Sequence, residues 1–533
     1  MELSSWTKFL KTIIWIRLLF FCYYCQAGKI LVIPVYGSHW VNMKILIQEL
    51  HNRGHNITVV MPYSSMYMNE ESPYYTSLKI TLPLIQNTTT GKRFDRMVDN
   101  MVYHRSIGSW FSLVALQFEM YTFLSMGHQM SCLMAATIFE NQEIMKRLKD
   151  AQFDMALTDP GLGGGVLIAQ YLQLPMVYNV RWLISGEAHF SIAPSPISYI
   201  PLTWTELTDK MTFFERFKNV VNYGFNVCFE RFFVRPHYSE VCLRYFGPDV
   251  NINTLIQSAD IWLTRVDFVF EFPRPTMPNV VYVGGFQCQP SKPLPSDLEQ
   301  FMESSGEHGV IVMSLGTLVN NLPKDIANHI AAAFAQLPQK VIWRYTGETP
   351  SSLGNNTLLV KWIPQNDLLG HPKTRIFVSH GGTNGIYEAI YHGVPMVGLP
   401  LLFDQFDNFV RLTERGAARL LDISNIKTEY VLQVLKDVLE NPSYRNNMQR
   451  LSRLHHDQPI KPLDAAIFWI ESVINNKGAA HLRTESYRMP WYEYHCLDII
   501  LVLLFGITLL FICITISCRL MYYKVCRKSR AKG

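Results

Sequence analysis

Charged residues are scarce in this chain. Only 17% of its 533 residues are charged, against about 25% in a typical soluble protein, while 48% are hydrophobic. This apolar excess excludes a disordered chain and indicates a membrane segment. The formal charge of +5 lies at the ends: residues 519–533 carry six lysines and arginines and residues 1–27 carry a net +2, which leaves −3 on the body. A body so close to neutral lacks the basic field that nucleic-acid binding requires.

Several common site signatures are also missing. The chain has no Walker A sequence and no Gly-x-Ser-x-Gly elbow, and the glycine-rich stretch 161–165 is followed by Val166, where a dinucleotide loop needs its third glycine. The cysteines of the body show no Cys-x-x-Cys spacing, so a zinc knuckle has no support. These absences leave no metal site and no resident cofactor among the expectations.

The first 27 residues predict a secretory signal peptide. Lys8 and Lys11 precede a mostly apolar stretch, and Ala27 is a small residue at a plausible cleavage point. Arg17 interrupts the apolar stretch, so a retained anchor helix is the alternative.

A second apolar run near the other end predicts a membrane-spanning helix over residues 497–518. It is about 20 residues long, with aromatic residues before and after it. The basic residues 519–533 then form a cytosolic tail by the positive-inside rule. Of the Asn-x-Thr acceptors, Asn87 and Asn355 lie in loop-like sequence and are glycosylation candidates, whereas Asn56 opens what reads as a buried strand.

The body reads as two α/β halves. A continuous apolar run at 29–33, a helical pattern with Met43, Leu46 and Leu50, and a second run at 57–60 make one βαβ unit. This unit places His39 at the carboxyl end of its first strand, where open α/β sheets bind ligands. Another strand, 153–159, ends in Asp159. The pattern restarts at 309–313, after a proline-rich linker at 270–300. We therefore expect two Rossmann-like domains, residues 28–285 and 286–485, that face each other.

The stretch from Trp362 to Asn408 carries the strongest chemical signal. His380 ends a strand, and small residues lead into a helix near Gly385, which is the arrangement of a diphosphate cradle. Glu388, one turn into that helix, can accept hydrogen bonds from ribose hydroxyls. Trp362 offers a flat face to a base, and the pair Asp404-Gln405 can bind sugar hydroxyls.

This stretch resembles the signature of the UDP-dependent glycosyltransferases, and the whole chain resembles the vertebrate UDP-glucuronosyltransferases. The resemblance extends to residues 37–40, 306–309, 314–316, 343–345 and 368–372 and to the membrane anchor. It implies a GT-B fold, with an amino-terminal acceptor domain and a carboxy-terminal donor domain. It also implies an inverting, metal-independent transfer of glucuronic acid from UDP-glucuronic acid to small lipophilic molecules.

The resemblance also assigns roles. It implies His39 as the catalytic base and Asp159 as its acidic partner, with Arg265 facing the glucuronate carboxylate and Asp404 and Gln405 contacting the sugar. The residues implied as UDP contacts are Ser314, Trp362, Gln365, His380, Asn384, Gly385 and Glu388.

The resemblance implies a single-pass type I protein of the endoplasmic reticulum membrane, with its body in the lumen. It allows homo- or hetero-oligomers with related subunits. Two alternatives stay open: the same fold and mechanism using UDP-glucose or UDP-N-acetylglucosamine, or a catalytically silent UDP-sugar-binding regulatory subunit. The acceptor cannot be read, because its pocket is expected from variable loops over residues 60–125 and 185–240.

Overall fold

The structure is a computed structural model of the chain. It describes residues 27–35, 37–62, 68–81, 90–181, 189–316, 319 and 321–530. The chain divides into two units, Met1–Leu482 and Arg483–Gly533. Most of the expected signal peptide and Asn87 lie outside the described residues.

The first sheet has seven parallel strands in the order β3-β2-β1-β4-β5-β6-β7. Most of its strands are buried on both faces, which is why they read as continuous apolar runs. The strand order reverses between β1 and β4, where Ile33 pairs with Thr158. The strands are β1 (Lys29–Ile33), β2 (Asn56–Pro62), β3 (Thr76–Ile80), β4 (Met155–Thr158), β5 (Met176–Val180), β6 (Ile261–Thr264) and β7 (Val280–Tyr282).

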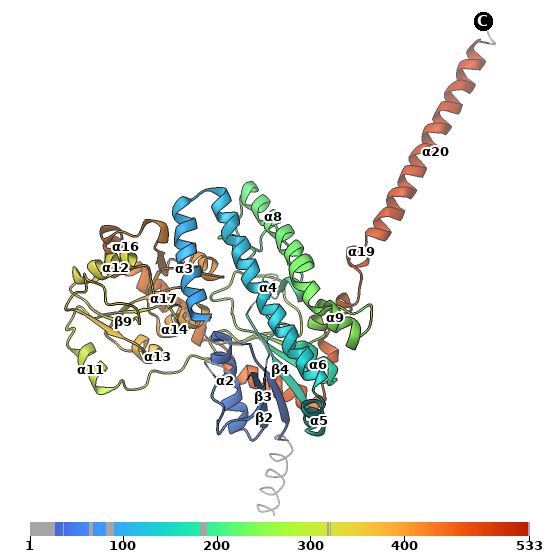
Figure 1. Ribbon diagram of the computed structural model, residues 1–533. Helices are drawn as coiled ribbons and strands as arrows, with labels where there is room; N and C mark the ends of the chain where they lie inside the picture. Colours follow the sequence, from blue (N-terminus) through green and yellow to red (C-terminus); the bar gives the residue numbers. More distant parts are fainter. Residues whose placement is uncertain are drawn as a thin grey trace, which may run out of the picture. The chain divides into compact units, whose positions relative to one another are not determined.

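Helices cover this sheet (Figure 1). The first of them, α2, buries the predicted stripe of Met43, Leu46 and Leu50 against the strands. It begins at Ser38, so His39 lies in the first turn of a helix. The helices of this half are α2 (Ser38–Asn52), α3 (Thr90–Ile107), α4 (Trp110–Glu140), α5 (Gln142–Asp150), α6 (Gly164–Tyr171), α7 (His189–Ile192), α8 (Phe213–Phe229), the π-helix η1 (Glu230–Val234), α9 (Arg235–Tyr245) and α10 (Ile252–Gln257).

The second sheet has six parallel strands in the order β10-β9-β8-β11-β12-β13. Its order reverses between β8 and β11, where Ser314 pairs with Ser379. The strands are β8 (Val310–Ser314), β9 (Lys340–Arg344), β10 (Thr357–Val360), β11 (Thr374–Ser379), β12 (Met396–Gly398) and β13 (Ala418–Leu420). The helices are α11 (Ser296–Glu303), α12 (Lys324–Ala335), α13 (Gln365–Leu369), α14 (Thr383–His392), α15 (Gln405–Glu414), η2 (Ile423–Asn425), α16 (Thr428–Glu440) and α17 (Pro442–His456). Two parallel Rossmann-like sheets are therefore confirmed.

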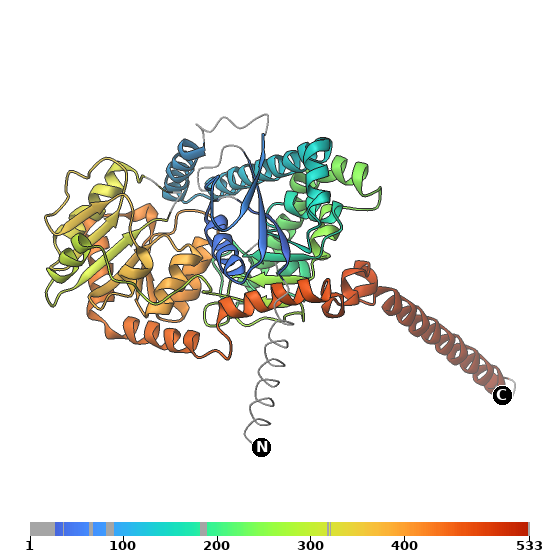
Figure 2. The same ribbon diagram turned by 90° about the horizontal axis from the view of Figure 1, so that it is seen from below.

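The chain returns to the first sheet at its end. Helix α18 (Pro462–Asn476) buries Ile467, Ile470 and Val473 in the same core as Ile30 and Val32 of β1. Figure 2 shows this orange-red helix beside the blue first half. The stretch 462–476 thus packs with the first domain, although we expected it in the second. Its apolar stripe predicts a buried helix but does not indicate which core buries it.

Three other local expectations differ. The expected acceptor loops contain long helices. Helix α3 and the first half of α4 lie within residues 60–125, and α8 lies within residues 185–240. The proline-rich linker contains β7, the last strand of the first sheet. Asn56 does begin β2, but its side chain is exposed, because a strand's first residue precedes the buried part of the sheet.

The second unit holds η4 (Glu485–Tyr487), α19 (Trp491–Tyr494) and α20 (Leu497–Arg530), after η3 (Ala480–Leu482) closes the first. Within α20, Leu497–Lys524 is long and apolar enough to cross a membrane. This helix is compatible with the expected anchor and is longer than the apolar run alone.

Candidate active site

The first reversal point brings His39 and Asp159 together. His39 follows β1 and Asp159 directly follows β4, and these two strands are neighbours. Because the carboxyl ends of parallel strands meet at one edge, residues 120 positions apart come into contact. The Nδ1 atom of His39 lies 2.6 Å from Oδ2 of Asp159.

The carboxylate of Asp159 orients the ring of His39. Burial acts to raise the pKa of Asp159, but the adjacent His39 and Arg265 and the Gly161 amide overcome it and hold that pKa below its usual value. An ionised carboxylate accepts the Nδ1–H proton of His39, so the lone pair of the ring lies on Nε2. The side chain of His39 is 17% exposed, whereas that of Asp159 is 1% exposed. The pair can therefore act as an accessible base with a buried orienting acid.

Arg265 belongs to this pair. It directly follows β6, and its guanidinium Nη2 lies 3.2 Å from Nδ1 of His39 and 3.5 Å from Oδ2 of Asp159. The resemblance implied a sugar carboxylate as its partner. The observed contacts show that Arg265 already compensates the charge of Asp159.

The residues of the predicted diphosphate cradle lie at the second reversal point. Gly316 follows β8, His380 follows β11, and Gly382 precedes α14. A Cβ atom on Gly316 would lie 2.7 Å from the His380 ring, and one on Gly382 would lie 2.6 Å from it. The imidazole is thus held between two glycines. Burial lowers the pKa of His380 to about 4, so the ring is neutral at physiological pH.

The first backbone N–H groups of α14 can act as hydrogen-bond donors to a ligand. Its N-cap is Gly382, and no side chain caps it, so the first backbone N–H groups suit an anion. Ser314 is buried, and its hydroxyl accepts the N–H of Gly316 at 3.4 Å, while Arg344 donates to the Gly316 carbonyl. Ser314 therefore shapes the loop, and a UDP contact from it stays a prediction.

The predicted nucleoside contacts lie close together. Gln365, at the start of α13, donates to the carboxylate of Glu388 on α14. Burial raises the pKa of Glu388 to about 7, although this hydrogen bond opposes the rise. Gly385 allows α14 to pack closely, since a Cβ there would lie 3.1 Å from Phe377. Trp362 is 70% exposed, as a stacking platform must be.

The two residues predicted to contact the sugar, Asp404 and Gln405, already form hydrogen bonds within the protein. The Gln405 carboxamide oxygen accepts the N–H groups of Leu401 and Leu402, at 2.8 and 2.9 Å. A sugar contact from Gln405 therefore has to come from its amide nitrogen. Asp404 accepts a hydrogen bond from Asn408 at 3.0 Å and lies 3.5 Å from Nε of Arg181.

Among the contacts between the first half and the donor half, two lie beside the candidate site residues. Asn42, one turn after His39 on α2, donates to Oδ1 of Asn384 on α14 at 2.9 Å. Arg181, directly after β5, donates to Oδ1 of Asn408 at 2.9 Å. Sequence reasoning missed Asn42, Arg181 and Asn408. The signal for Arg181 was its place after an apolar run, the same signal that identified Asp159.

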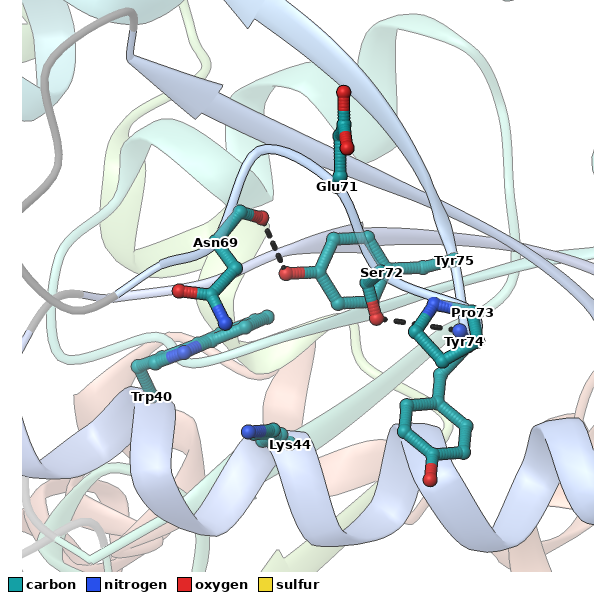
Figure 3. Close-up of a pocket in the computed structure, with 8 residues that line it drawn as sticks. All are labelled: Trp40, Lys44, Asn69, Glu71, Ser72, Pro73, Tyr74 and Tyr75. Carbon is teal, nitrogen blue, oxygen red and sulfur yellow. Dashed lines mark hydrogen bonds between the residues drawn. The ribbon is translucent and has the colours of Figure 1, made fainter.

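A cavity of about 110 Å³ lies beside α2 (Figure 3). Trp40 and Lys44 of α2 line it together with the loop before β3, where the Tyr75 hydroxyl donates to the Asn69 carbonyl at 2.7 Å. Ligand pockets measure about 300–1,000 Å³, so this cavity is too small for the acceptor.

Among the residues that the structure describes, one group has the spacing of a metal site: Glu299, Glu303 and His371. It lies at the start of β11, the opposite end from His380. Nδ1 of His371 accepts the N–H of Lys373 at 3.2 Å, so its proton lies on Nε2 and points to Glu299, 3.4 Å away. That tautomer leaves neither ring nitrogen with a free lone pair for a metal ion.

Comparison with known proteins agrees with this geometry. The family model described as "UDP-glucoronosyl and UDP-glucosyl transferase" matches residues 28–532. UDP-glucuronosyltransferase 2C1 of Oryctolagus cuniculus is 43% identical over 92% of this chain and 97% of that protein. UDP-glucuronosyltransferase 2B17 of Homo sapiens is 40% identical over 96% of this chain and 97% of that protein.

Solved glycosyltransferases share the fold. A UDP-glucosyltransferase from Polygonum tinctorium, 14% identical, superposes with a TM-score of 0.56 over 85% of this chain and 99% of that one. The spinosyn forosaminyltransferase SpnP, 16% identical, gives 0.56 over 84% and 100%. These likenesses establish the GT-B fold. With two facing reversal points, the family match across the chain and relatives above 40% identity, this chain belongs to the UDP-glucuronosyltransferase family and is a glycosyltransferase that binds a UDP-sugar donor.

Proposed function

We propose that this enzyme transfers glucuronic acid from UDP-glucuronic acid to a hydroxyl, or a similar nucleophile, of small lipophilic acceptors, without a metal ion. The observation that carries the proposal is the His39–Asp159 pair at one reversal point, joined through the Asn42–Asn384 contact to the donor helix α14 at the other. A base and a diphosphate cradle are the two parts that such a transfer needs.

In this mechanism Nε2 of His39 takes the proton of the acceptor hydroxyl. The acceptor oxygen attacks the anomeric carbon from the face opposite UDP, and the bond between that carbon and the diphosphate breaks. The product is a β-glucuronide, and no covalent enzyme intermediate forms. Asp159 orients the imidazole and stabilises its charged form. The N–H groups at the start of α14 stabilise the charge that develops on the leaving UDP.

The donor sugar has a second candidate. Arg265 supports a carboxylate-bearing sugar, because a guanidinium fork matches a carboxylate. However, Arg265 already contacts Asp159 and His39, so binding a sugar carboxylate is not the one role that explains its presence here. This engagement favours keeping UDP-glucose or UDP-N-acetylglucosamine as the alternative donor, with the same base and cradle.

A catalytically silent regulatory subunit is less well supported. Such a protein has no need of a base, yet His39 and Asp159 are both present and lie 2.6 Å apart. We also propose that the enzyme is a single-pass protein of the endoplasmic reticulum with its body in the lumen, which the candidate span and the basic tail after it support.

The test is a donor panel on the full-length protein in microsomes. UDP-glucuronic acid, UDP-glucose and UDP-N-acetylglucosamine are each supplied with one weakly acidic alcohol, and the conjugates are identified by mass. We expect the glucuronide to form with the highest kcat/KM. A preference for UDP-glucose would replace the proposed donor, and no transfer from any donor to several acceptors would favour the silent subunit.

A further inference from the structure

The carboxylate of Asp404 is turned away from the helix that it begins. Asp404 is the N-cap residue of α15, a place where aspartate normally accepts backbone N–H groups of the first turn. Among the described residues, its side chain makes no such hydrogen bond. Oδ2 of Asp404 instead accepts a hydrogen bond from Nδ2 of Asn408 at 3.0 Å and lies 3.5 Å from Nε of Arg181. Two other side chains therefore determine where this carboxylate lies.

Asn408 holds the carboxylate in one orientation. Its side chain is fully buried, and Nδ2 also donates to the carbonyl of Gly381 at 2.9 Å. Oδ1 of Asn408 accepts a hydrogen bond from Nη2 of Arg181 at 2.9 Å. A guanidinium only donates, whereas a carbonyl and a carboxylate only accept, so the amide fits these partners in a single orientation. Asn408 thus transmits the position of Arg181 to Asp404.

Arg181 comes from the first half of the chain, although Asp404 belongs to the donor half. It directly follows β5, which pairs with β6, so it lies beside Arg265 at the same edge of the first sheet. Burial lowers the pKa of Arg265, whereas Asp159 raises it; of the two smaller effects, Arg181 lowers this pKa and Asp404 raises it. The charges of Arg181 and Asp404 therefore lie near the proposed catalytic residues.

A buried ion-pair network fixes Arg181. Nη1 of Arg181 donates to Oε1 of Glu271 at 2.8 Å, and Oε2 of Glu271 accepts from Nε of Arg411 at 2.8 Å. The side chains of Arg181 and Glu271 are 7% and 4% exposed. Two guanidinium groups thus share one carboxylate, so Arg181 keeps an attraction for a second carboxylate, that of Asp404.

We propose that Arg181 is a positioning residue for the donor sugar: it holds Asp404 directly and through Asn408, so the sugar subsite is complete only where the two halves meet. Both contacts of Asp404 use Oδ2, which leaves a sugar hydroxyl to Oδ1. The predicted diphosphate cradle around His380 lies in the donor half alone, so Arg181 should act on the sugar and not on UDP. This role rests on the proposed function in one respect, the predicted sugar contact of Asp404, and not on which UDP-sugar is the donor.

The contacts of Arg181 favour this role over direct binding of a sugar carboxylate. Each of its three guanidinium nitrogens has a partner in the protein: Glu271, Asn408 or Asp404. A sugar carboxylate at the same place would approach the carboxylates of Glu271 and Asp404 and be repelled by both. Ring hydroxyls, by contrast, occur in glucuronic acid and in glucose. A positioning role therefore predicts an equal effect on both UDP-sugars.

Binding without an acceptor tests this role. UDP-glucuronic acid, UDP-glucose and UDP are each titrated by calorimetry into the full-length protein in detergent. Arg181→Lys keeps a positive charge beside Glu271, but one ammonium group cannot replace a planar fork that meets three partners. We expect it to weaken both UDP-sugars about tenfold, the scale of one hydrogen bond to a charged group, and UDP less than about threefold. In an Asp404→Ala background, Arg181→Lys should weaken the UDP-sugars less than about twofold further, because the two residues act as one unit.

The matched control is Asp407→Asn. Asp407 precedes Asn408 on α15 and also joins the two halves, since its carboxylate accepts the N–H groups of Trp204 and Glu206 at 2.6 and 2.9 Å. These contacts do not involve Asp404, so the variant loosens the same junction and leaves the sugar subsite in place. The affinity of each UDP-sugar relative to UDP should stay at its wild-type ratio. A sugar-selective loss as large as that of Arg181→Lys would overturn the proposal.

The other outcomes are equally distinct. Equal weakening of UDP and both UDP-sugars by Arg181→Lys would make Arg181 a structural bridge, and a loss confined to UDP-glucuronic acid would show a direct contact with its carboxylate. An additive loss in the Asp404→Ala background would exclude Asp404 as the intermediary. If Asp404→Ala spares the UDP-sugars, the predicted sugar contact and this role both fail, whereas the proposed donor fails only if the wild-type enzyme prefers UDP-glucose. The unfolding midpoint identifies a variant that fails to fold, and Arg181→Gln then replaces Arg181→Lys.

Discussion

At the scale of single residues, the proposed base and the proposed leaving-group site lie apart in the sequence and follow strands of different sheets. His39 belongs to the first sheet, and His380 belongs to the second. General-base catalysis contributes about 10²–10⁴-fold. His39→Ala should therefore lower turnover by that order while the UDP dissociation constant, measured by calorimetry, changes no more than a few-fold.

Two variants control this prediction. Asp159→Asn should resemble His39→Ala, because it leaves the imidazole wrongly polarised, and His380→Ala should weaken UDP binding as well. The acceptor must have a weakly acidic hydroxyl, since a strongly acidic phenol ionises unaided. Most activity retained with alanine at position 39 would refute the mechanism.

Arg265 makes a second prediction about the donor. If it contacts the sugar carboxylate, Arg265→Leu should raise KM for UDP-glucuronic acid and leave KM for UDP-glucose nearly unchanged. Because Arg265 also lies 3.5 Å from Asp159, kcat should fall with both donors. A fall in kcat without a donor-selective change in KM would restrict Arg265 to positioning the catalytic pair.

Glu388 predicts a pH dependence of donor binding. Burial raises its pKa to about 7, so the carboxyl is mostly protonated at pH 6 and mostly ionised at pH 8. Ribose hydroxyls donate best to the ionised form and would lower this pKa in the complex. The affinity for UDP-glucuronic acid, measured without acceptor, should therefore rise by up to about tenfold from pH 6 to pH 8. Glu388→Gln should flatten the profile, and an unchanged slope in that variant would exclude Glu388 as its source.

At the scale of elements, the start of α14 depends on its glycines. Gly382 has a φ of −65°, so alanine fits the backbone there, but its Cβ would lie 2.6 Å from Nε2 of His380. Gly382→Ala should displace the imidazole and weaken UDP binding at least about tenfold, on the scale of losing one hydrogen bond to a charged group. The matched control is Gly224→Ala in α8, where an added Cβ would have no neighbour within 4 Å. Equal UDP affinity of both variants would show that His380 tolerates the shift.

At the scale of the whole molecule, the span and tail predict the topology. Protease added to sealed microsomes should remove only residues after about Arg519, because the basic tail stays in the cytosol. Immunoblots against the body and against the tail report the two sides, and detergent should expose the body. Digestion of the body in intact vesicles would contradict the lumenal orientation and, with it, glycosylation at Asn87 and Asn355.

The sequence by itself determined the strands, the donor signature and the span. Strands such as β1 and β8 are buried on both faces, so their apolar runs are visible locally. The cradle around His380 is also local, since its glycines and its helix follow one another within a few residues. For the same reason, His39 and Asp159 could be placed after strands before either was known to contact the other.

The tertiary structure decided which of these local pieces meet. The order of strands in each sheet brings His39 to Asp159 and Gly316 to His380, and sequence spacing does not specify that order. It also placed Arg265 beside the His39–Asp159 pair and α18 in the first core. The clearest case is α8: its periodicity shows an apolar side and a polar side, but only the partners of Asn219 and Asn226 show that the polar side points inward. Periodicity is a local property, whereas the side of a helix that packs depends on residues far away in the chain.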